Sequence, residues 1–164
     1  MVIYDDVVIG SGCKINASSI IGCECSGIER DLDYSMITFP HTSNVIIEDN
    51  VTIGVRTTIV RGVLTPTKIG RGSTIDSHCL IGHNTHISSN VYISSGTCVS
   101  GSVKIGEGVN IFTRSVIGEW ISIGKYSVIG MASMVNKDIP EFEMWYGHPA
   151  RFVKKLHEKY IPFE

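Results

Sequence analysis

Long hydrophobic runs, blocks of like charge and paired cysteines are all missing from this 164-residue sequence. No apolar stretch approaches the roughly 20 residues of a membrane-spanning helix, so we expect no membrane span. The formal net charge is −2, and Lys and Arg cluster only near the C-terminus, which argues against nucleic-acid binding. Hydrophobic residues make up 43% of the chain and charged residues 18%, which indicates a folded domain.

The five cysteines are an odd number, and they lack the spacing of metal-binding pairs. We interpret them as small thiols in a reducing compartment and expect no metal. The alternative is a zinc half-site formed by Cys23 and Cys25, but no second pair follows them. The first ten residues lack the basic and long apolar segments of a signal peptide, so we expect a cytoplasmic protein.

The dominant positive feature is a six-residue repeat. Every sixth residue from Ile69 to Val135 is isoleucine or valine, and the same period appears upstream. A small residue usually follows, and a small or β-branched residue usually stands two positions earlier. Alternating inward side chains indicate short strands, and the small residues suit tight corners. Three strands and three corners close a coil of about 18 residues, whose parallel strands stack about 4.8 Å from those of the next coil.

The repeat therefore predicts an all-β solenoid with a ladder of isoleucine and valine inside it. We assign residues 1–150 to this β-helix, with a loop excursion at residues 23–44. A second irregularity lies between Ile59 and Ile69, which we interpret as ten residues in place of twelve. Residues 151–164 form a tail, in which the segment VKKLHEKY predicts a short helix that covers the last coil.

The hexads resemble those of hexapeptide-repeat acyltransferases. That resemblance implies a left-handed parallel β-helix, although crossovers between parallel strands are otherwise right-handed. The segment from Ile21 to Gly106 resembles the UDP-3-O-acyl-glucosamine N-acyltransferases of lipid A synthesis, through FPH, VIIEDNVTIGVRTTIVRG, TKIGRGSTIDSHCLIGHN and SGSVKIGEG. The chain from His83 onward also resembles N-acetyltransferases of nucleotide-linked amino sugars. The family resemblance further implies a homotrimer with active sites between subunits.

His83, in the segment IGHNTHIS, interrupts the pattern of small polar corners. With 18 residues in a coil, Gly101 lies next to it on the same edge. An imidazole can remove a proton from a nucleophile, and a backbone N–H can bind the developing oxyanion. Spacing alone leaves open a solvated corner histidine. The resemblance implies that His83 is the general base and that Gly101 supplies the oxyanion N–H. Some relatives have an acid after the base, where this chain has Asn84, so Asp76 is a candidate to orient His83.

The remaining candidates fall into two groups. For the substrate we expect contacts from residues of the excursion, of a neighbouring corner and of the position after the base: Tyr34, Phe39, His41, His78 and Asn84. The closing segment MVNKDIPEFEMWYGHPARFVKKL resembles that of CoA-dependent hexapeptide acetyltransferases. This resemblance implies a CoA channel bordered by Gly147, Pro149, Ala150, Arg151 and Lys154. The alternative is that these cations solvate a terminal helix.

These features predict an enzyme that moves an acyl group, most simply acetyl, from acetyl-CoA to the amino group of a nucleotide-linked amino sugar. Acylation of a sugar hydroxyl is the alternative, because the same base and oxyanion donor serve it. A zinc enzyme similar to γ-class carbonic anhydrases is a different class, but Ser88 stands where those need a second histidine. A purely structural solenoid is disfavoured by its mixed outward residues. Longer acyl chains and an acyl carrier protein donor stay open.

Overall fold

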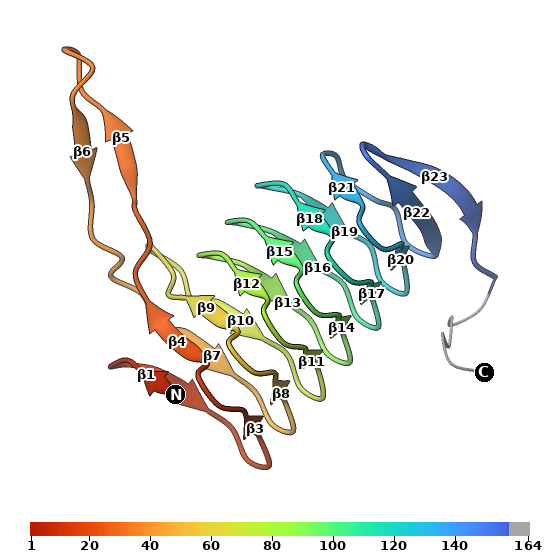
Figure 1. Cartoon of the computed structure of the whole chain (residues 1–164), viewed down its shortest axis with the longest axis horizontal. Helices are drawn as coiled ribbons and strands as arrows, with labels where there is room; N and C mark the ends of the chain where they lie inside the picture. The colour runs from red at the N-terminus through yellow and green to blue at the C-terminus, as the bar shows by residue number, and fades with distance from the viewer. Residues whose placement is uncertain (158–164) are drawn as a thin grey trace.

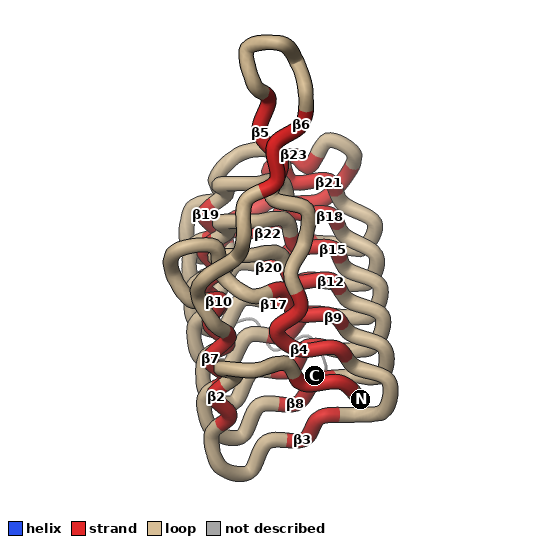
Figure 2. Tube along the Cα trace, turned by 90° about the vertical axis from the view of Figure 1, so that its left-hand side faces the viewer, coloured by secondary structure: helices blue, strands red, loops and turns tan. Residues whose placement is uncertain are grey.

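The computed structural model describes residues 1–157, and all of their regular structure is β-strand. The chain winds into a prism of stacked coils whose three faces are parallel sheets, and a hairpin projects from one edge (Figures 1 and 2). Face A contains β1 (Val2–Ile3), β4 (Ile20–Cys23), β9 (Thr58–Val60), β12 (Leu80–Ile81), β15 (Cys98–Val99), β18 (Val116–Ile117) and β21 (Met134–Val135).

Faces B and C are built in the same way. Face B contains β2 (Val8–Ile9), β7 (Val45–Ile47), β10 (Thr67–Ile69), β13 (His86–Ile87), β16 (Lys104–Ile105) and β19 (Ser122–Ile123). Face C contains β3 (Lys14–Ile15), β8 (Thr52–Ile53), β11 (Thr74–Ile75), β14 (Tyr92–Ile93), β17 (Asn110–Ile111), β20 (Val128–Ile129), β22 (Glu143–Gly147) and β23 (Ala150–Lys155).

The pairing register confirms the predicted coil length where the repeat is unbroken. Ile81 of β12 pairs with Val99 of β15, which in turn pairs with Ile117 of β18, so each coil adds 18 residues. The repeat residues point inward and are buried, as with Ile81, Ile93 and Ile117, each 0% exposed. A fully buried isoleucine contributes about 1.5–3 kcal/mol through the hydrophobic effect. The interior ladder therefore holds the coils together.

The small polar residues two positions before each repeat residue also have a structural role. The hydroxyl of Ser73 donates to the carbonyl of Ser88 at 2.9 Å, and that of Thr85 donates to the carbonyl of Ser100 at 3.0 Å. These hydroxyls are buried, so they need such partners. Each bond also joins one coil to the next.

Both irregularities of the repeat lie at the same corner, between faces A and B. The excursion at residues 23–44 leaves the prism after β4 and forms an antiparallel hairpin of β5 (Ile28–Arg30) and β6 (Met36–Thr38) before β7. The prediction that residues 59–69 shorten two hexads is wrong. Strands β9 and β10 lie on consecutive faces, so this segment is one hexad with a four-residue insertion at the corner.

The predicted C-terminal helix is also wrong within the described residues. Residues 150–155 form β23, which runs antiparallel to β22 at the end of face C. Without β23, the outer edge of β22 would present unpaired backbone groups, and edge strands of this kind promote aggregation. Pairing with that edge therefore prevails over the helical pattern of the sequence. The part of the predicted helix beyond His157 lies outside the described residues.

We predict that Ile93→Ala lowers the free energy of unfolding by about 2–5 kcal/mol, because the truncation leaves a cavity inside the ladder. Val55→Ala is the control, since Val55 lies at a corner and is 39% exposed. We expect it to cost less than about 1 kcal/mol. Urea denaturation followed by circular dichroism measures both values, and equal losses for the two variants would contradict the assignment of the core.

Candidate active site

The residues that follow face A in successive coils are stacked along the A/B edge. The backbone N–H of Ser102 donates to the carbonyl of His83 at 2.8 Å, and that of Trp120 donates to the carbonyl of Gly101 at 3.2 Å. His83, Gly101 and Glu119 therefore form one column of corner residues. The two insertions at the same edge lie immediately before this column.

His83 and Gly101 are in direct contact. A Cβ added to Gly101 would lie 2.5 Å from both Cε1 and Nε2 of His83, so only glycine leaves room for the ring. The Gly101 N–H donates no hydrogen bond to another described residue. The N–H groups of Ser11 and Arg71, at matching positions of other corners, are bound by the carboxylates of Asp49 and Glu48. The N–H beside His83 is therefore available to a ligand.

The base of the hairpin covers the other side of His83. His41 is 2% exposed, and its ring meets that of His83 edge-on, with the centroids 5.6 Å apart and an interplanar angle of 77°. Phe39 stacks on His41 with the centroids 6.1 Å apart, and Sγ of Cys25 lies 3.2 Å from Nε2 of His41. The fold thus brings Phe39 and His41 of the FPH motif to His83.

Burial lowers the pKa of His41, and the neighbouring His83 lowers it further. His41 therefore stays neutral where an ordinary histidine begins to gain a proton. Nδ1 of His41 and Nδ1 of His83 are both buried and have no hydrogen-bond partner among residues 1–157. Buried polar atoms normally have partners. These two nitrogen atoms are exceptions to that rule.

No carboxylate orients His83 through the residues that the sequence suggested. Asp76 accepts from the hydroxyl of Ser95 at 2.6 Å, at the corner between faces C and A, and this bond lowers the pKa of Asp76. Oδ1 of Asn84 accepts from the N–H of Val63 at 2.6 Å, so Asn84 anchors the second insertion. Packing against Gly101 and His41 orients the His83 ring instead.

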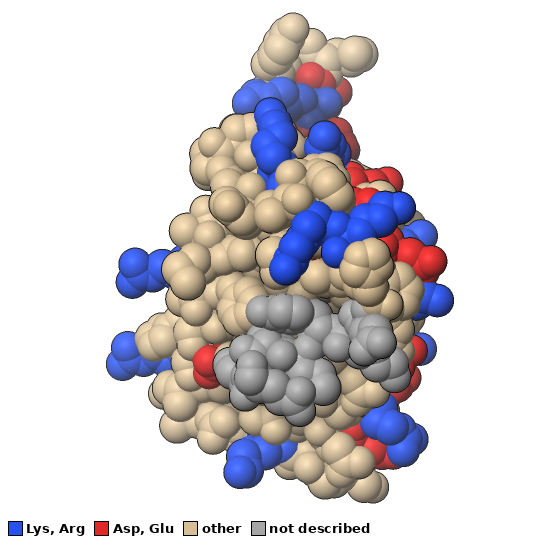
Figure 3. Space-filling model, turned by 90° about the vertical axis from the view of Figure 1, so that its right-hand side faces the viewer, with Lys and Arg blue, Asp and Glu red and all other residues tan. Residues whose placement is uncertain are grey.

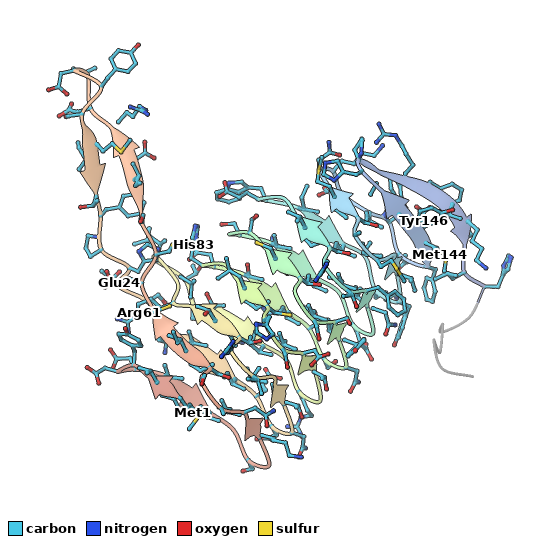
Figure 4. All side chains as sticks on the ribbon, viewed as in Figure 1. Met1, Glu24, Arg61, His83, Met144 and Tyr146 are labelled. Carbon is cyan, nitrogen blue, oxygen red and sulfur yellow. The ribbon has the colours of Figure 1, made fainter. Side chains whose placement is uncertain are left out.

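Charged side chains surround the base of the hairpin. Glu24 lines a cavity of about 420 Å³ with Cys25 and Phe39, and Figure 4 shows Glu24 and Arg61 near His83. Arg61 is held by the carbonyl of Asp5 at 2.9 Å, while its Nε is buried without a partner. The site therefore contains both signs of charge close to the imidazole.

Two of the predicted substrate residues lie apart from His83 within the chain. His78 is at the corner between faces C and A, where it lines a cavity of about 400 Å³ with Ser95 and Arg114. Tyr34 is at the tip of the hairpin and is 78% exposed. The described residues include no group of three or more His, Cys, Asp or Glu placed to hold a metal ion.

The residues expected at a CoA channel form the turn and second strand of the β22–β23 hairpin. Gly147 has a φ of 107°, which favours glycine, and Pro149 follows a cis peptide bond. Ala150 is buried, whereas Arg151 and Lys154 are exposed. Figure 3 shows Lys and Arg side chains grouped on the face of the molecule that carries this hairpin. Within one chain this hairpin, which contains Met144 and Tyr146, lies apart from His83 (Figure 4).

Several residues near His83 were missed by the sequence analysis. A cavity of about 240 Å³ beside it is lined by Thr65, Asn84, Ser102, Lys104, Trp120 and Ser122. Asn84, Ser102 and Trp120 are 18 residues apart and occupy the position after His83, Gly101 and Glu119. Counting one further coil along the sequence therefore finds Trp120. Thr65 required the structure, because the insertion disrupts the count.

Comparisons with known proteins agree with this geometry. Residues 44–79 match the model of the hexapeptide repeat of succinyl-transferase. The resemblance predicted from the sequence is confirmed. The hexapeptide-repeat segment is similar to UDP-3-O-acylglucosamine N-acyltransferase of Idiomarina loihiensis, with 40% identity over 79 residues, which is 48% of this chain and 23% of that protein. The protein of that name from Methylococcus capsulatus is 39% identical over 77 residues, or 47% and 22% of the two chains. The matches thus span less than a quarter of these relatives.

Solved structures share the fold of this hexapeptide-repeat chain. UDP-N-acetylglucosamine acyltransferase of Francisella novicida has a TM-score of 0.77 at 23% identity and covers 93% of this chain and 61% of its own. A mutant of perosamine N-acetyltransferase from Caulobacter crescentus, in complex with CoA and GDP-perosamine, has a TM-score of 0.54 at 14% identity, with coverages of 90% and 58%. The left-handed parallel β-helix predicted for this chain is confirmed as its fold class. The described residues contain no helix of the length and apolarity needed to cross a membrane.

We predict that the pKa of His41 lies below its ordinary value of about 6.5, so that a smaller fraction of the ring is protonated at pH 6 than in an ordinary histidine. Because His83 contributes to the lowering, His83→Ala should raise the pKa of His41 part of the way back. NMR titration of the ring nitrogen and carbon signals, assigned with His41→Phe, measures both effects. A His41 that gains its proton at the ordinary pH would contradict the buried position of the ring.

Proposed function

We propose that this chain is an acyltransferase that moves an acyl group, most simply acetyl, from a CoA thioester to the amino group of a nucleotide-linked amino sugar. The observation that carries the proposal is the contact of His83 with Gly101, beside an N–H that has no partner in the described chain. A base next to an oxyanion donor is the arrangement that acyl transfer needs.

In the proposed reaction, the nitrogen of the acceptor amine attacks the thioester carbonyl. The neutral His83 accepts a proton from this amine during the attack. The Gly101 N–H donates a hydrogen bond to the oxyanion of the tetrahedral intermediate. The intermediate then collapses, the C–S bond breaks, and His83 returns the proton to the departing CoA thiolate. His83 therefore serves first as a base and then as an acid, and ends the cycle neutral.

The resemblance of the C-terminal segment supports a CoA donor. Arg151 and Lys154 are exposed cations that suit the phosphates of CoA, and Gly147 and Pro149 shape the turn beside them. These residues and His83 lie apart within one chain, so a site between subunits accounts for both. We propose a homotrimer of this kind in the cytoplasm.

An amino sugar acceptor is supported by the names of the relatives, which include N-acyltransferases. A sugar hydroxyl is the second candidate, because a solved structure of the same fold is a UDP-N-acetylglucosamine O-acyltransferase from Moraxella catarrhalis, with a TM-score of 0.66. The same base and oxyanion donor serve either nucleophile. The two candidates therefore differ only in the acceptor.

The test is a panel of acyl-CoAs of increasing chain length against UDP-, GDP- and dTDP-linked sugars that carry either an amino or a hydroxyl group at the reacting position. Release of the CoA thiol measures turnover, and mass spectrometry identifies the product. We expect acetyl-CoA and an amino sugar to give the fastest reaction. Faster transfer to the hydroxyl counterparts would replace the proposed acceptor, and absence of transfer to every acceptor would contradict the proposed function.

We predict that His83→Ala reduces turnover by about 10²–10⁴-fold, because general base catalysis contributes about that much. Gly101→Ala should also reduce turnover strongly, since its methyl group would displace the His83 ring. His157→Ala is the control, because His157 is exposed and has no assigned contact with the acceptor or the donor. Steady-state kinetics on folded variants measures the effect. Near-normal turnover of His83→Ala would remove His83 from the mechanism.

A further inference from the structure

Trp120 is an unusual residue for a corner of this β-helix. Its side chain is 77% exposed, whereas Trp145, the other tryptophan of the sequence, is 7% exposed. Its backbone has a φ of 61°, in the left-handed region that disfavours bulky side chains. Asn84 and Ser102, the preceding corner residues of the column, are small and polar. Within one chain, the exposed ring of Trp120 is open to contact with a ligand.

The surroundings of Trp120 form a cavity suited to a polar ring. Trp120 lines the cavity of about 240 Å³ together with Ser102, Lys104 and Asn84, which is the residue after His83. Asn84 uses Oδ1 to accept from the N–H of Val63, which directs its amide N–H₂ away from that backbone. Lys104 is exposed and has no ion pair among the described residues. The cavity thus combines an aromatic face, neutral hydrogen-bonding groups and one cation.

We propose that this cavity binds the sugar ring of the acceptor, stacked on Trp120, with an anionic phosphate of the acceptor against Lys104. The inference rests on the proposed function. It assigns the acceptor to the face B side of the A/B edge, where Lys104 and Ser122 line the cavity. The apolar C–H face of a sugar packs on an aromatic ring, while its hydroxyl groups bind amides and hydroxyls such as those of Asn84 and Ser102. The ammonium of Lys104 acts as a point charge for phosphate.

The geometry favours the sugar over the nucleobase as the partner of Trp120. The corner of Trp120 lies two coils from that of His83, and parallel strands stack about 4.8 Å apart. The ring that carries the reacting group must contact His83, and Trp120 shares its cavity with Asn84, the residue after His83. The second cavity on face B, of about 670 Å³, shares Lys104 and Ser122 with the first and continues away from His83. The remainder of an extended acceptor has room there.

The first experiment measures binding without catalysis. Acrylamide quenching of tryptophan fluorescence reports mainly Trp120, because Trp145 is buried. The probes are N-acetylglucosamine 1-phosphate, N-acetylglucosamine, uridine diphosphate and inorganic phosphate, each added to the full chain. We expect the sugar phosphate to protect the exposed tryptophan most strongly. Trp120→Phe is the control, and it should remove the protectable signal while thermal unfolding is unchanged.

Lys104→Met tests the anionic contact. We expect it to reduce protection by the sugar phosphate to the level given by the neutral sugar, and to leave the neutral sugar unaffected. No protection by the sugar phosphate would overturn the proposal. Protection by uridine diphosphate as strong as that by the sugar phosphate would also overturn it, because Trp120 would then hold the base.

A kinetic experiment separates this proposal from the proposed function. With the best acceptor of the panel, Trp120→Ala should raise the KM for the acceptor by about 10-fold or more, which corresponds to about 1.4 kcal/mol. The KM for acyl-CoA should stay unchanged, and Trp120→Phe should restore most of the loss. An unchanged acceptor KM would overturn the role of Trp120 while the acyltransferase stands. Absence of acyl transfer, with protection by sugar phosphate retained, would instead contradict the proposed function alone.

Discussion

Every feature of this protein depends on the pairing of each strand with the strand one coil later. That pairing keeps isoleucine and valine in an unbroken inner ladder, and it brings corner residues 18 positions apart into contact. Additional residues are tolerated at a corner, because they leave the ladder in register. Within a strand they would move the inward side chains outward. Variation in this fold is therefore confined to corners, which is where the candidate site lies.

The two insertions and the histidine share one edge, and this accounts for the site. An isolated two-stranded hairpin is only marginally stable in water. Here the base of the hairpin is fixed by Phe39, which stacks on His41, and by His41, which packs on His83. The second insertion is fixed by the bond from Val63 to Asn84. The contact that secures the hairpin also packs against the imidazole that touches Gly101, so the hairpin and the proposed catalytic histidine share one set of interactions.

The orientation of His83 by packing distinguishes this site from one in which a carboxylate holds the base. A neutral His41 adds no charge beside the base, and burial keeps it neutral. Glycine at position 101 admits the ring because it has no side chain, and in the proposed mechanism its N–H binds the oxyanion. Glu119 is the next residue of this column after Gly101, and Trp120 follows it. In the proposed site, Trp120 binds the acceptor.

The sequence by itself determined the coil, the inward ladder and the proximity of His83 to Gly101. Three six-residue repeats make one coil, so residues 18 positions apart lie at the same corner of adjacent coils. It did not determine the C-terminal segment, where VKKLHEKY has a helical pattern but residues 150–155 pair with the free edge of β22. It also grouped His78 and Asp76 with His83, although they lie at another corner. Only the tertiary structure placed both insertions at one edge and set His41 against His83, because neither contact follows the period and both depend on how irregular segments fold back onto the prism.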